Sequence, residues 1–266
     1  MNVEVVCHSE SAARTACREV AAEVLEECRV AGPPVDARLI ADRLGLEIAL
    51  DASQHGRGRI KRLRGRTTIL VRPEDRPERL QWTIAHEIGE HVAHRVFRRL
   101  DFDPDLAGPR IREQIANEMA SQLLLPGDSF LDDARRLDAD LPRLKQTYAT
   151  ASHELILTGL LRLPELSLVT VCDHGRITRR RGNGQLSPPP LLPIECDVWR
   201  RVHGSGHPAD ETAEGVRVQG WAVHEPGWKR ELLRTTALDM MEGHELQVDE
   251  QPMLDADSLA PAVDVS

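Results

Sequence analysis

Residues 83–95, TIAHEIGEHVAHR, constrain the fold of this chain more than any other stretch. Apolar residues recur among the charged ones at helical spacing, which predicts a long helix over residues 78–97. Residues four apart on a helix point within roughly 40° of each other, so the pattern H-E-x-x-H can place two histidines on one zinc ion. The glutamate of that pattern acts as general base in metal-dependent hydrolysis. The sequence of this stretch is therefore similar to that of a metal-binding helix, although it does not match the H-E-x-x-H pattern fully.

The chain departs from this pattern at the second metal position. His86 and Glu87 occupy the first two places, but Glu90 stands at the fourth residue on and His91 one residue further. On a regular helix His91 lies about 140° from His86, so it would reach a shared ion only through a π-bulge. His94 lies roughly 12 Å from His86 along the axis, too far for the same ion. The spacing leaves two second ligands open, Glu90 in register or His91 after a bulge.

A second periodic segment, expected to be a helix over residues 112–125, supplies a third candidate ligand. Glu113 and Asn117 are four residues apart and share one face of it. A carboxylate from a neighbouring helix can complete a three-ligand zinc site and leave one position open. The amide can hydrogen-bond a ligand histidine and fix its tautomer. Glu118 is an alternative to Glu113, but it would leave Asn117 without a role.

Together the two helices resemble the ImmA/IrrE family of metallo-endopeptidases. The matching segments are WTIAHEIGEHVAH and EQIANEMASQLLLP, and the resemblance covers about residues 35–126. Members carry an aromatic-Thr-Ile-Ala-His-Glu-x-Gly-His helix and then a Glu-x-x-Ala-Asn helix that ends in Leu-Leu-x-Pro. The resemblance implies that His86 is a zinc ligand, Glu87 the general base and Glu113 the third ligand.

The same resemblance bears on the second ligand. Members often have histidines at positions 0, 4 and 8 of this helix, and His86, Glu90 and His94 fit that frame without an insertion. This favours a site of His86, Glu90 and Glu113, in which Glu90 replaces a histidine. A second carboxylate makes the ion a weaker Lewis acid and shifts its preference from Zn²⁺ towards harder ions such as Mn²⁺. We therefore expect a bound metal with reduced catalytic power.

The rest of the sequence predicts an α+β chain built from several parts. Helical spacing predicts a helix over 10–30, and strands are expected at 46–50, 57–63 and 67–71. A hairpin is expected over 166–181, turning on a His-Gly pair. The expected order is a helical extension (1–32), a zincin-like metallopeptidase domain with a twisted sheet and active-site helices (33–128), a helix-turn-helix-like segment (129–164), a β-rich region (165–240) and an acidic disordered tail (241–266).

Composition narrows the class of protein. The chain has 34 basic and 43 acidic residues, a net charge of -9, which argues against broad binding to nucleic acid or anionic membranes. The first ten residues contain no Lys or Arg, and no apolar run approaches the ~20 residues of a membrane span, so a cytoplasmic protein is expected. The five scattered cysteines are expected to be reduced and to bind no zinc, and the tryptophans at 199, 221 and 228 to anchor a core.

Three stretches are candidates for partner contacts. RGRIKRLRGR at 57–66 has six basic residues in ten, and it is interpreted as a solvated edge strand or as a peptide-binding edge that prefers an acidic segment. Residues 141–163 predict two short helices around a turn, but the second has almost no Lys or Arg. Its phosphate contacts would be weak, so direct nucleic-acid binding is not expected. RITRRR at 176–181 is the best remaining candidate for such a contact.

The resemblance also implies a function. ImmA/IrrE-like proteins cut helix-turn-helix repressors in the cytosol and switch on the genes that those repressors silence. An intracellular, site-specific endopeptidase with a protein substrate is therefore expected, with slow or conditional turnover because of Glu90. The alternative is a member of the fold that has lost catalysis and acts as a binding-only regulator, either an anti-repressor or a DNA-linked module.

Overall fold

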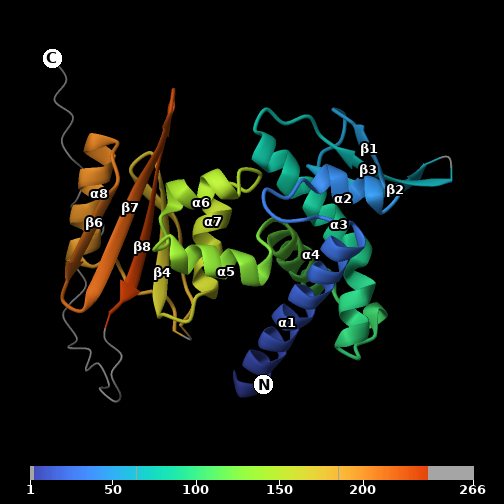
Figure 1. The fold of residues 1–266 in the computed structure, drawn as a ribbon, viewed down its shortest axis with the longest axis horizontal. Helices are drawn as coiled ribbons and strands as arrows, with labels where there is room; N and C mark the ends of the chain where they lie inside the picture. The colour runs from blue at the N-terminus through green and yellow to red at the C-terminus, as the bar shows by residue number, and fades with distance from the viewer. Residues whose placement is uncertain (1–2, 64, 185, 239–266) are drawn as a thin grey trace.

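The computed structural model describes residues 3–63, 65–184 and 186–238, and it has the α+β class expected from the sequence (Figure 1). A small sheet with helices forms the N-terminal part, and a larger sheet with helices on both faces forms the C-terminal part. The acidic tail predicted over 241–266 lies outside the described residues. None of the described helices is long and apolar enough to cross a membrane.

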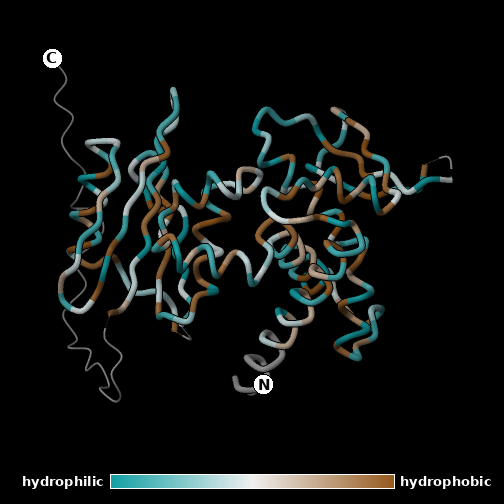
Figure 2. The backbone as a smooth tube through the Cα atoms, in the orientation of Figure 1, coloured by the Kyte–Doolittle hydropathy of each residue, from teal (hydrophilic) through white to brown (hydrophobic). Residues whose placement is uncertain are grey.

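Three strands form the N-terminal sheet, in the order β1-β3-β2. They are β1 (Glu47–Leu50), β2 (Gly58–Leu63) and β3 (Arg66–Val71), where the sequence placed them. β3 pairs in parallel with β1 and antiparallel with β2, which leaves β2 as an edge strand. The coloured part of the β2–β3 hairpin is largely hydrophilic towards its projecting end (Figure 2), and the basic residues of β2 are exposed. Both interpretations of the basic stretch at 57–66 require such an edge.

The N-terminal part also has four helices: α1 (Val3–Glu27), α2 (Ala37–Arg43), α3 (Pro77–Arg99) and α4 (Pro109–Leu124). α2 and α3 contact the sheet. Asp36 caps α2 by accepting a hydrogen bond from the backbone N–H of Arg38 at 2.9 Å. Pro77 and Pro109 stand at the starts of α3 and α4, where proline removes no intrahelical hydrogen bond. α1 begins before residue 10, earlier than predicted, and packs against α3 and α4.

The packing of α3 against α4 is the contact that any metal site on these helices requires. Ile84 and Ile88 of α3 and Met119 and Leu123 of α4 are fully buried in one core. At Gly89 the two backbones approach closely: a Cβ there would lie 2.8 Å from the carbonyl oxygen of Ala116. The helices therefore lie side by side, as the ligand pattern requires.

The C-terminal part is a five-stranded antiparallel sheet in the order β5-β4-β8-β7-β6. Its strands are β4 (Ser167–Asp173), β5 (Arg176–Gly182), β6 (Ala209–Ala213), β7 (Val216–Glu225) and β8 (Trp228–Ala237). Its helices are α5 (Gly127–Arg136), α6 (Leu141–Thr147), α7 (His153–Gly159) and α8 (Pro193–Ser205). α5, α6 and α7 cover one face, and α8 covers the other (Figure 1). The predicted hairpin is β4–β5, and its turn residues His174 and Gly175 both have positive φ.

One expectation for this region was wrong in part. Residues 193–205 form helix α8 within the predicted β-rich region, and Trp199 lies on that helix. Pro193 at its start and the side chain of Glu195, which accepts a hydrogen bond from the backbone N–H of Leu192 at 2.7 Å, stabilise its first turn. Of the three tryptophans expected in the core, only Trp221 is buried, and Trp199 and Trp228 are half-buried.

Candidate metal centre

Helices α3 and α4 bring three potential ligands to one point. The Nε2 atom of His86 lies 3.8 Å from a carboxylate oxygen of Glu90 and 3.7 Å from one of Glu113. One ligand atom from each of these side chains lies within 4.8 Å of the other two. The structure thus brings together the three residues that were expected from the sequence to be metal ligands.

Asn117 orients the imidazole of this group. Its Oδ1 lies 3.1 Å from Nδ1 of His86, and its Nδ2 donates a hydrogen bond to Glu113 at 3.0 Å. Since the amide nitrogen already donates to a carboxylate, its oxygen is the natural acceptor for an Nδ1–H of His86. That tautomer leaves the lone pair of Nε2 directed at the two carboxylates, as a metal ligand requires.

The charges at this point fit a divalent cation. Two carboxylates of the group and Glu87 beside them surround a single imidazole. Burial lowers the pKa of His86, but its pairing with Glu90 and the nearby negative charges outweigh burial and leave the pKa raised. The same pairing lowers the pKa of Glu90. One nitrogen and two oxygens are a donor set that zinc and harder ions such as manganese both accept.

Glu87 lies on the same helix but in different surroundings. Only 4% of this residue is exposed, and among the described residues its Oε2 atom has no hydrogen-bond partner. Burial raises its pKa to about 7, with a further contribution from Glu90, and the backbone N–H of Ile60 on β2 opposes this rise. A buried carboxyl that titrates near neutral pH is suited to act as a general base.

Gly58 makes room for this carboxyl, and the sequence analysis did not identify it. A Cβ at Gly58 would lie 2.5 Å from Oε1 of Glu87 and 2.6 Å from the methyl group of Thr83. A glycine inside a strand pattern signals a close approach of another group, so the signal was present in the basic stretch. The first residue of the edge strand β2 therefore forms one wall around Glu87.

The alternative ligands lie outside the group. α3 is α-helical throughout, without the π turn that would bring His91 to the ion, and the side chain of His91 is exposed. The nitrogen Nδ1 of His94 lies 3.1 Å from the carbonyl oxygen of His91. Glu118 accepts a hydrogen bond from Gln122 at 2.7 Å and is not part of the group. In this fold Glu90, rather than His91, stands beside His86.

Residues 41–155 match the sequence profile of the peptidase M78 family, described as the IrrE N-terminal-like domain. This segment is similar to the IrrE N-terminal-like domain. The resemblance seen in the two helices is thereby confirmed, and the matching family is one with a metallopeptidase-type fold. Its match runs past residue 126, through α5 and α6 and into α7.

The wider fold also occurs in a solved structure. A Mycobacterium tuberculosis transcriptional regulator aligns with a TM-score of 0.62 at 16% identity, over 83% of this chain and 75% of that one. At that identity the likeness shows a common fold, which extends beyond the IrrE-like domain. No curated protein matches the sequence of this chain.

Proposed function

We propose that this protein is a cytoplasmic, metal-dependent endopeptidase that cuts a helix-turn-helix transcriptional repressor. The observation that carries the proposal is the convergence of His86, Glu90 and Glu113 on one point, next to the buried carboxyl of Glu87. Membership of residues 41–155 in the peptidase M78 family supports the same chemistry.

His86, Glu90 and Glu113 would hold one divalent ion, Zn²⁺ or Mn²⁺. When bound, such an ion supplies Lewis-acid chemistry, polarising the scissile carbonyl and making water more acidic. Asn117 keeps His86 in the tautomer and orientation that ligation needs.

In this proposal Glu87 transfers a proton from the attacking water to the leaving amide nitrogen. Its unpartnered Oε2 accepts a proton from the water that attacks the scissile carbonyl. It then delivers that proton to the amide nitrogen as the C–N bond breaks, which restores the carboxylate. The wall formed by Gly58 keeps the carboxyl buried, so its proton affinity suits both steps near neutral pH.

The edge strand β2 is the proposed substrate-binding surface. It pairs only with β3 among the described residues. Apart from the N–H of Ile60, which is bonded to Glu87, its outer backbone groups would be available to an extended peptide. Arg59, Lys61 and Arg62 are exposed along it and favour an acidic segment. β2 packs against α3, so a peptide bound along this edge would lie near the ligand group. The name of the M. tuberculosis protein, a transcriptional regulator, is compatible with a substrate in gene control.

The experiment is co-expression of the protein with helix-turn-helix repressors encoded near its gene, followed by mass spectrometry of the repressor. We expect a single internal cut with the wild type and with His91→Gln, whose side chain lies outside the group. Glu87→Gln should abolish the cut and retain the metal, whereas His86→Gln should lose both. A cut that persists in Glu87→Gln would come from another protease and would refute the proposal.

A second candidate function is repressor binding without cleavage, and Glu90 favours it. An added carboxylate weakens the Lewis acidity of the ion, so the fold could retain a partner and lose turnover. Tight repressor binding without a cut, unchanged in Glu87→Gln, would support this function. Gain of cleavage in Glu90→His would identify Glu90 as the cause of the loss.

A further inference from the structure

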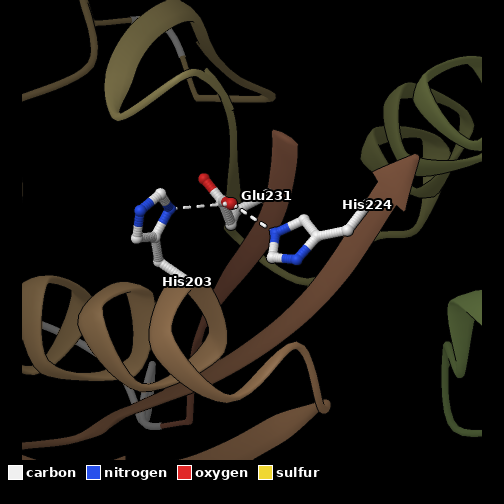
Figure 3. A group of neighbouring side chains, drawn as sticks. All are labelled: His203, His224 and Glu231. Carbon is white, nitrogen blue, oxygen red and sulfur yellow. Dashed lines mark hydrogen bonds and ion pairs between the residues drawn. The ribbon is translucent and has the colours of Figure 1, made fainter. Parts of the chain in front are cut away.

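A second group of metal-type ligands lies in the C-terminal part, away from α3 and α4. His203 stands near the end of α8, His224 on β7 and Glu231 on the neighbouring strand β8. The two imidazoles approach the carboxylate from opposite sides (Figure 3). Nδ1 of His203 and Nε2 of His224 lie 3.0 Å and 2.7 Å from the same oxygen, Oε1 of Glu231.

The surroundings of Glu231 fix that oxygen in place. Its other oxygen accepts a hydrogen bond from the indole N–H of Trp199 at 3.1 Å. Glu231 is fully buried, whereas 39% of the His203 side chain and 23% of the His224 side chain are exposed. The group is therefore anchored from the inside and open to solvent on the side of the histidines.

A comparison with Glu195 shows what Glu231 lacks. Both glutamates are fully buried between α8 and the sheet. Glu195 has a bidentate pair with Arg180, at 3.0 Å and 2.9 Å, and Thr235 donates to it as well. Within the described part of the chain, no Lys or Arg pairs with Glu231. A buried carboxylate needs a positive partner, and a bound cation would supply one.

We propose that His203, His224 and Glu231 bind a divalent transition-metal ion, with Zn²⁺ the best fit. Two imidazoles and one carboxylate are a known three-ligand set for zinc, with a fourth position left for water. Bonds of about 2.0–2.1 Å in a tetrahedral site put ligand atoms about 3.3 Å apart. The two nitrogen–oxygen distances would lengthen by about 0.3 and 0.6 Å to reach that value, and the two nitrogens, which lie within 4.8 Å of each other, would adjust with them.

The bound ion would connect the end of α8 to the β7–β8 hairpin. This site does not depend on the peptidase chemistry, because its ligands come from other elements. The occupied site would stabilise the C-terminal part, since an ion that binds only the folded state raises its stability.

The experiment counts ions in full-length, tag-free protein, because a polyhistidine tag would bind the same metals. Zn²⁺ binding is measured by calorimetry and elemental analysis in a His86→Gln, Glu113→Gln background, which disables the candidate centre on α3 and α4. We expect this background to retain one equivalent. His203→Gln or His224→Gln added to it should weaken binding by at least about 100-fold, since each removes a ligand.

Two further variants separate a metal site from a simple hydrogen-bonded cluster. His207→Gln is the matched control: this exposed histidine is close to α8 in sequence but outside the group, and the variant should keep the full equivalent. Trp199→Phe keeps an aromatic ring, removes the donor to Glu231 and should weaken Zn²⁺ binding about 10–100-fold. Circular dichroism checks that each variant is folded, and His203, at the exposed end of its helix, tolerates replacement best. A folded background that binds no Zn²⁺ would overturn the proposal, as would wild-type affinity in the His203 variant.

Discussion

Gly89→Ala tests whether the close approach of α3 and α4 positions the candidate metal centre. The added Cβ would lie 2.8 Å from the carbonyl oxygen of Ala116 and 2.9 Å from Cβ of Met119. These atoms belong to the backbone and base of a packed helix, so they cannot rotate away. The contact is relieved only if α4 moves away from α3.

The size of that movement follows from the contact distances. Ordinary contacts begin at 3.4 Å, so α4 must shift by about 0.6 Å near Ala116. The next residue, Asn117, holds His86 at 3.1 Å, and the same shift lengthens this contact beyond about 3.5 Å, where the hydrogen bond is lost. Overpacking costs about 1–3 kcal/mol, and the better helix propensity of alanine returns about 0.5–1 kcal/mol. The net loss in the free energy of unfolding should be up to about 2.5 kcal/mol, with a central value of about 1 kcal/mol.

Urea denaturation and Zn²⁺ competition titration measure the two effects. Metal affinity at the candidate centre should fall about 10–100-fold, as expected when the partner of a ligand histidine moves. Gly204→Ala is the control, because a Cβ on that glycine of α8 meets no atom within 4 Å. It should leave stability unchanged or raise it by up to about 1 kcal/mol. If Gly89→Ala matched the wild type in both measurements, the close approach would not position this centre.

Three more predictions concern single side chains. In metal-free protein Glu87 has its pKa raised to about 7, so between its ordinary value and pH 7 the folded state binds a proton that the unfolded state has released. The stability of the wild type should therefore fall as pH rises through this range. In denaturation with a chelator present, Glu87→Gln should be more stable than the wild type at pH 8 by roughly 2–3 kcal/mol. The same pH dependence in both proteins would contradict this prediction. Asn117→Ala should weaken Zn²⁺ binding about 10–100-fold with unchanged circular dichroism, and unaltered affinity would show that the amide does not orient His86. Glu195→Ala leaves Arg180 buried without its partner and should lower the free energy of unfolding by about 3–5 kcal/mol in urea denaturation. A decrease below about 1 kcal/mol would contradict this prediction.

The helices and the grouped residues of the candidate centre were predictable because their signals are local. The four-residue spacings of His86 with Glu90 and of Glu113 with Asn117 set which side chains share a face before any tertiary contact forms. Apolar positions on both helices then required that they pack together. The strands near the centre, expected at 46–50, 57–63 and 67–71, were predictable because the runs of strand-forming residues are local too.

Contacts between distant segments were not predictable in this way. Gly58 and Glu87 meet because β2 packs against α3, and nothing near either residue specifies that partner. The group of His203, His224 and Glu231 requires a strand register and a helix that covers the sheet, and α8 itself was missed. The geometry of a helix determines which residues of that helix share a face. The register of paired strands and the order in which helices and sheets pack are determined only by the whole fold.

The environment of the two glutamates on α3 separates their roles more clearly than their residue type does. Glu87 and Glu90 are three residues apart, yet the first is almost fully buried beneath Gly58 and the second has a side chain 45% exposed beside His86. Burial raises the pKa of Glu87 to about 7, and pairing with His86 lowers that of Glu90. Adjacent carboxyls whose pKa values are driven apart are the usual basis for dividing proton transfer from charge stabilisation in an active site. The division favours Glu87 as the group that moves the proton and Glu90 as the group that stays ionised and holds the cation.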